Sequence, residues 1–210
     1  MPASRRSGKE RDAGMTSSSN VPASRPSNKG SFQSRKPADL EREALAAYRG
    51  GDLASACDGF AAAQAAYQAS GDALKAAEMA NNLCVALVGL GRGPEAVRAV
   101  EGSAAVFAAA GDRVRSARSL GNLASALESA GEPERATAIY EAAIEGLRAA
   151  GDRAGESETW QALSRLQLRR GDALGAAASA QAALDTHPKP GPFRRLLRSL
   201  SRGALRLPMV

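Results

Sequence analysis

The chain of 210 residues carries a net charge of +6, and 44% of its residues are hydrophobic, 24% charged and only 4% aromatic. These proportions are ordinary for a soluble protein of one or two domains, and the scarcity of aromatic and β-branched residues favours Ala- and Leu-rich helices over strands. No apolar run approaches the ~20 residues that cross a bilayer, so a transmembrane helix is not predicted.

The basic charge lies at the two ends of the chain. Residues 1–38 contain eight Lys/Arg and two Asp/Glu and are rich in Ser, Pro and Gly. With few apolar side chains to bury, this arm is predicted to be disordered. We interpret it as a linker or an electrostatic tether. A transit peptide is the alternative, although the arm has no amphipathic stretch, and Met15 is an alternative start.

Glycines recur every twenty residues from residue 51 to residue 171. Gly-Asp pairs occupy 51–52, 71–72, 111–112, 151–152 and 171–172, and Gly91 and Gly131 fall in the same frame. Glycine is the usual residue just past a helix C-terminus, and the Asp that follows caps the next helix. Each glycine is therefore a predicted corner between helices of about 17 to 19 residues. Forty residues make one antiparallel helix pair.

Stacking the forty-residue units aligns small side chains in columns. The columns are Ala56, Ala96, Ala136 and Ala176; Ala44, Cys84, Ala124 and Ser164; and Ala63, Ser103, Ala143 and Ala183. Small columns permit close helix packing, because bulky side chains would hold neighbouring helices apart. Four units are predicted, at about residues 31–70, 71–110, 111–150 and 151–190, and they should share one continuous core. Cys57 and Cys84 lie in these apolar patterns, which favours buried, reduced thiols.

The columns resemble those of the tetratricopeptide repeat family, whose units read W-x2-L-G-x2-Y, then A-x3-F, then P. Unit three matches at Leu120, Leu123, Ala124, Leu127, Ala136 and Tyr140, and unit four at Trp160, Leu163, Ser164, Ala176 and Pro188. The usual period is about 34 residues. The forty-residue period is similar to that of kinesin light chains and Pins-like polarity scaffolds. Unit one departs most, at Glu43 and Ala47.

The resemblance covers about residues 39–190 and implies an all-α, TPR-like α-solenoid of four helix-turn-helix repeats. It also implies that the first helix of each pair lines a concave groove. In similar repeats, the column Arg42, Asn82, Asn122 and Ala162 faces this groove. An asparagine carboxamide offers a donor and an acceptor to one peptide unit. Ligand contact and a structural bond between neighbouring helices both remain open for the two asparagines.

Other candidate residues share that helical face. They are Glu78, Asn81, Arg118, Ser125, Glu158, Gln161 and Arg165. A mixture of Arg and Asn suits a peptide carboxylate, whereas a solvated charged face is the alternative for Glu78, Glu158 and Arg165. Unit one lacks the lysine and asparagine of the family's chaperone-binding clamp, so that ligand is not predicted.

Residues 191–210 contain a basic amphipathic pattern. Phe193, Leu196, Leu197, Leu200, Ala204 and Leu207 share one face, and Arg195, Arg198, Arg202 and Arg206 share the other. Gly191-Pro192 stands in the frame where Gly151-Asp152 stands one unit earlier, so this helix is predicted to cap the array. The alternative is contact of the four arginines with an anionic membrane surface or an acidic partner. Nucleic-acid binding would be non-specific at most, because the ends have few aromatics for base stacking.

No set of catalytic or metal-binding residues is recognisable. His187 is the single histidine, and no glycine-rich phosphate loop occurs. The sequence therefore predicts a non-catalytic, cytoplasmic scaffold without a cofactor, which binds a peptide or helix of a protein partner in the groove. The alternative function is a membrane-surface adaptor that docks through the C-terminal helix.

Overall fold

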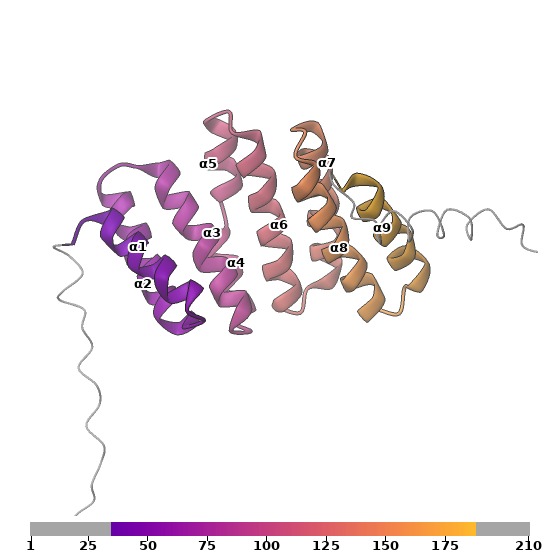
Figure 1. Cartoon of the computed structure of the whole chain (residues 1–210), viewed down its shortest axis with the longest axis horizontal. Helices are drawn as coiled ribbons and strands as arrows, with labels where there is room; N and C mark the ends of the chain where they lie inside the picture. Colours follow the sequence, from indigo (N-terminus) through magenta and orange to yellow (C-terminus); the bar gives the residue numbers. More distant parts are fainter. Residues whose placement is uncertain (1–34, 188–210) are drawn as a thin grey trace, which may run out of the picture.

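The computed structural model describes residues 35–187, and within this range the chain forms nine α-helices and no strand (Figure 1). The helices are α1 (Pro37–Arg49), α2 (Leu53–Ala69), α3 (Ala73–Gly89), α4 (Gly93–Val100), α5 (Ser103–Ala109), α6 (Arg113–Ser129), α7 (Pro133–Ala149), α8 (Arg153–Arg169) and α9 (Ala173–Thr186). They form four helix pairs that follow one another along the long axis in chain order (Figure 1). The predicted all-α solenoid of helical repeats is confirmed. The predicted capping helix at 191–210, and the arm up to residue 34, lie outside the described residues.

Glycine and aspartate form the corners as predicted. All seven corner glycines, from Gly51 to Gly171, have φ between +70° and +81°. This left-handed conformation is strained for a residue with a side chain. Asp72 caps α3, because its Oδ1 accepts the backbone N–H of Lys75 at 3.0 Å. The same contact caps α2, α6, α8 and α9, whereas α4 and α7, which lack it, have a proline in the first turn.

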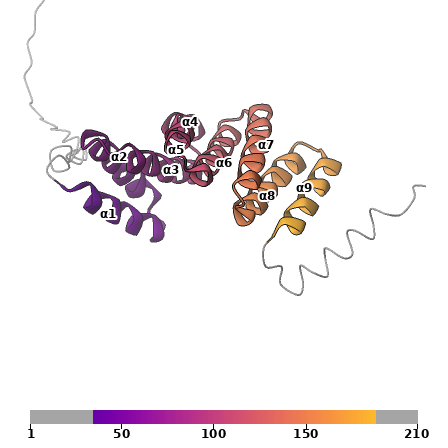
Figure 2. The same ribbon diagram turned by 90° about the horizontal axis from the view of Figure 1, so that it is seen from above.

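The second helix of unit two is broken, so the expectation of one uninterrupted helix between Gly91 and Gly111 is wrong. Glu101 turns to ψ 130°, and Gly102 follows with φ +84°. Because Gly102 adopts the left-handed conformation inside the run, α4 ends before it and α5 begins after it. Figure 2 shows both short helices next to α3, on the same side of it. Ser103 and Phe107 of α5 are still buried, so the break does not remove this segment from the core.

The small columns lie at helix contacts. Ala56, Ala96 and Ala136 have no exposed surface. Two groups of apolar side chains make up most of the core, one mainly in units one and two and the other in units three and four. Helix α6 belongs to both, because Ala126 packs in the first group and Leu127 in the second. The array is therefore held together through α6.

Both cysteines are free and buried, as predicted. Cys84 of α3 is 1% exposed, and its thiol donates to the backbone carbonyl of Asn122 on α6 at 3.6 Å. Burial raises the pKa of Cys84 to about 12. This thiol therefore marks the contact between units two and three.

Candidate functional site

The candidate site is the first-helix face, which we define as the side of α1, α3, α6 and α8 that carries Arg42, Asn82, Asn122 and Ala162. The predicted residues on α6 and α8 meet there in one cavity of about 480 Å³. Its lining includes Arg118, Asn122 and Ser125 from α6, Glu158, Ala162 and Arg165 from α8, and Tyr140 from α7. Two neighbouring first helices thus bring together six residues that the sequence analysis placed on this face.

Arg118 is held at the wall of this cavity by an ion pair between units. Its Nε lies 2.7 Å from Oδ2 of Asp152, and the Oδ1 of the same carboxylate caps α8 at the N–H of Gly155. The hydrogen bond from Arg118 lowers the pKa of Asp152, an effect that outweighs the opposing effect of burial. Arg118 therefore serves the contact between α6 and α8, although its side chain is still 57% exposed.

Arg165 differs from the other arginines of the cavity. Arg169 pairs with Glu128, whose Oε2 also accepts the hydroxyl of Tyr140 at 3.1 Å. Arg165 is exposed and forms no ion pair with any residue in 35–187. Glu158, two turns earlier on α8, is exposed as well. Arg165 is thus a cation of the cavity that is available to a ligand anion.

The asparagines of the first-helix face have different roles. Asn122 Nδ2 donates to Asn81 Oδ1 at 2.9 Å, and Ser119 Oγ donates to the same oxygen at 3.0 Å. Asn81 in turn donates to the carbonyl of Ala77 at 2.8 Å. The structural bond that the sequence left open for Asn122 is therefore present between α3 and α6. The side chain of Asn82 makes no hydrogen bond within the described residues.

Asn82 instead lines an apolar pocket at the other end of the face. The pocket has a volume of about 150 Å³ and is also lined by Leu45, Tyr48, Phe60 and Val85. Tyr48 and Val85 are each 38% exposed, which is high for large apolar side chains. The first-helix face therefore combines an apolar part on α1 and α3 with a charged and polar part on α6 and α8.

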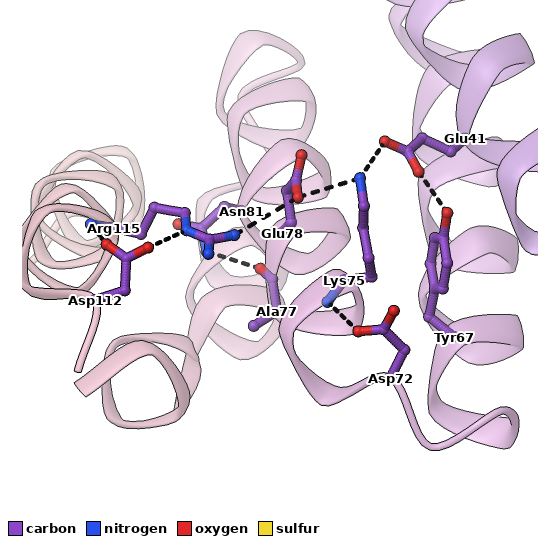
Figure 3. A network of polar contacts seen from close by, with 9 residues as sticks. All are labelled: Glu41, Tyr67, Asp72, Lys75, Ala77, Glu78, Asn81, Asp112 and Arg115. Carbon is purple, nitrogen blue, oxygen red and sulfur yellow. Dashed lines mark hydrogen bonds and ion pairs between the residues drawn. The ribbon is translucent and has the colours of Figure 1, made fainter. Parts of the chain in front are cut away.

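A ladder of polar contacts runs across α1, α2 and α3 (Figure 3). Glu41 accepts the Tyr67 hydroxyl at 2.5 Å and Lys75 Nζ at 2.9 Å. Burial, the largest single effect, raises the pKa of Glu41, but the hydrogen bonds from Tyr67 and Lys75 together outweigh it and lower the pKa. Burial and the same hydrogen bond raise the pKa of Tyr67 to about 12. Units one and two are joined by these contacts.

The ladder continues to α6 through Glu78, which the sequence placed in the groove. Glu78 lies 3.4 Å from Lys75 and 3.9 Å from Arg115 (Figure 3). Its carboxylate is therefore used between neighbouring units. Arg42 is 71% exposed and pairs with Asp39 of its own helix at 2.9 Å. Gln161 lies beside Arg165 in a third pocket, at the end of the array.

Sequence reasoning missed the apolar part of the face. Leu45 and Val85 occupy the same column as Ser125 and Arg165, so following that column towards the N-terminus would have found them. Glu128 and Arg169 were missed because they pair across two units, 41 residues apart.

Within the described range, no three His, Cys, Asp or Glu side chains are grouped so that they could hold a metal ion. No helix in this part of the chain has the length and apolar character needed to span a bilayer.

Four helix pairs that stack in chain order define a helical-repeat solenoid. Residues 75–149 match the family model of the tetratricopeptide repeat, which supports assigning the repeats in this range to that family. Repeats of this family generally mediate protein–protein interactions and are typically non-catalytic scaffolds. A similar solved structure is the crystal structure of BtubC (BKLC) from P. vanneervenii, which is 17% identical with a TM-score of 0.49, over 81% of this chain and 83% of that chain. No curated protein matches the chain.

Proposed function

We propose that the protein is a non-catalytic scaffold whose first-helix face binds a segment of a protein partner, either extended or helical. The observation that carries this proposal is the cavity between α6 and α8, where Arg165 is exposed without an ion pair in the described range. A carboxylate of the partner would pair with this guanidinium, which is suited to planar, bidentate contacts. Asn122 and Ser125 in the same cavity would add hydrogen bonds.

The apolar pocket indicates a second kind of residue that the partner should carry. Tyr48 and Val85 expose apolar surface beside Asn82. Burial of a large aliphatic or aromatic side chain of the partner there would therefore make the free energy of binding more favourable. A segment that fits the whole face therefore carries an apolar residue near α1 and α3 and an acidic residue near α6 and α8. A cytoplasmic location belongs to the same proposal, because Cys57 and Cys84 are free thiols.

A peptide-display selection against the full chain tests this function. We expect enriched peptides to contain Asp or Glu together with a large apolar residue. For a selected peptide, Arg165→Glu should raise the Kd by about tenfold or more, because it replaces electrostatic attraction to the acidic residue of the peptide by repulsion. Val85→Ser should also raise the Kd of the same peptide, because it removes apolar contact with the large apolar residue of the peptide.

The matched control is Arg98→Glu, which makes the same charge change on the exposed surface of α4, a second helix. This variant should leave the Kd within about twofold. Equal affinity of wild type and Arg165→Glu, measured by fluorescence anisotropy at low and at physiological salt, would contradict the proposal.

A further inference from the structure

The charges that line the cavity between α6 and α8 fall into a paired and an unpaired group. Three arginines and two glutamates contribute to the lining. Arg118 is paired with Asp152, and Arg169 is paired with Glu128. Both ion pairs join unit three to unit four. These two arginines therefore serve the contact between units and add little net charge to the cavity.

The unpaired group consists of Arg165 and Glu158. Both side chains are exposed, and neither forms an ion pair in the part of the chain that the structure describes. Glu78 and Arg118, which occupy the position of Glu158 in units two and three, each pair with a residue of the following unit. The cavity therefore offers one free cation and one free anion to a ligand.

The two free charges have a defined separation because both lie on α8. Seven residues make nearly two turns of an α-helix, so Glu158 and Arg165 leave the same face of α8 about 10.5 Å apart along its axis. We propose that the site selects a dipolar segment of the partner, with an acidic side chain at Arg165 and a basic side chain at Glu158. This inference rests on the proposed function, to which it adds the basic residue and its spacing.

The separation of the charges predicts a spacing in the partner sequence. An extended segment rises about 3.1–3.4 Å per residue, so three residues cover about 10 Å. In a polyproline II segment, residues three apart also project from the same side. In a helical segment the same distance corresponds to seven residues. The acidic and basic residues are therefore expected three apart in an extended segment or seven apart in a helical one.

Glu158 contributes to selectivity more than to affinity. An exposed ion pair changes the affinity by only about two- to fivefold. A second acidic residue of the partner at this position would instead be repelled by the carboxylate of Glu158. The cavity should therefore disfavour a segment with two acidic residues at this spacing, although arginines outnumber glutamates in its lining.

Peptide display against three forms of the full chain tests this selectivity. Wild type should enrich peptides that carry Lys or Arg three or seven residues from the acidic residue. Glu158→Arg should enrich a second acidic residue at that place instead. The matched control is Glu141→Arg, which makes the same charge change on the exposed surface of α7, a second helix, and should enrich the wild-type pattern.

The outcomes separate this inference from the proposed function. Enrichment of acidic residues by wild type without the basic residue would overturn the dipolar site alone. Equal enrichment of the basic residue by wild type and by Glu158→Arg would also overturn it. If wild type enriches no acidic residue, the proposed function fails as well.

The affinities of one selected peptide provide a direct test of the contact. Glu158→Gln should raise the Kd by about two- to fivefold, and replacement of the basic residue of the peptide by glutamine should do the same with wild type. The peptide substitution should have no further effect on the Glu158→Gln variant, because the ion pair is already lost. Additive effects of the two substitutions, measured by fluorescence anisotropy, would overturn the contact.

Discussion

Gly93→Ala is expected to separate α4 from α6. A Cβ at residue 93 would lie 2.3 Å from the backbone nitrogen of Ala130 and 2.3 Å from the carbonyl carbon of Ser129. These are backbone atoms at the end of α6, so no side-chain rotation can relieve the overlap. Gly93 does not have a positive φ, so alanine is acceptable to its backbone conformation. The cost of the substitution therefore reports the close approach alone.

Overpacking of this kind costs about 1–3 kcal/mol. For a domain of this size, each kcal/mol changes the Tm by roughly 2–4 °C, so we expect the Tm to fall by about 2–12 °C. Gly121→Ala is the matched control. Its Cβ would lie 3.8 Å from Thr159 Oγ1, an ordinary contact, and residue 121 is inside α6.

The control should therefore stabilise the protein by about 0.5–1 kcal/mol, because alanine is a better helix former than glycine. Thermal and urea unfolding followed by far-UV circular dichroism provide the measurement. A Gly93→Ala protein as stable as wild type would show that α4 does not approach the end of α6 in this way.

Three further predictions concern packing and polar contacts. Ala136→Leu should cost about 1–3 kcal/mol in unfolding free energy, because residue 136 has no exposed surface, and an unchanged urea midpoint would exclude a tight contact there. Asn81→Ala should cost about 1–3 kcal/mol through the loss of hydrogen bonds from Ser119 and Asn122, whereas Asn82→Ala should leave the thermal transition almost unchanged; equal losses would contradict the separate roles of these neighbours. Glu41 has a lowered pKa when folded, so its ionised form stabilises the protein above pH 4.5, the ordinary pKa, and this contribution is lost as the pH falls below it. The stability difference between wild type and Glu41→Gln should therefore shrink on acidification, and a constant difference would refute the linkage.

The repeat period was predictable because glycine, aspartate and alanine each meet a requirement set by the residues close to them in the structure. Corners need a positive φ, caps need a short acceptor, and tight helix contacts need small side chains. The helix break at Gly102 could not be predicted in the same way. This residue lies inside a helical run, as Gly59 and Gly146 do, but those two remain helical and lie close to an alanine of the neighbouring helix. An isolated glycine permits either outcome, and only packing decides between them.

The location of the first-helix face was predictable from the columns, but the state of its side chains was not. Asn81 and Asn122 are both polar residues on one face in the sequence, and only their proximity across α3 and α6 joins them by a hydrogen bond. Arg118 likewise finds Asp152 because successive first helices lie next to each other. Arg165 is distinguished by the lack of such a partner within residues 35–187, which no single unit can show.

The buried thiol of Cys84 offers a natural reporter of motion. A thiolate reacts with alkylating reagents far faster than a thiol, and here both burial and the raised pKa suppress it. Modification therefore requires the transient separation of α3 and α6, so its rate measures how often the contact between units two and three opens. A ligand that spans this contact would slow the alkylation of Cys84 in proportion to its occupancy, which gives a binding assay that needs no engineered residue.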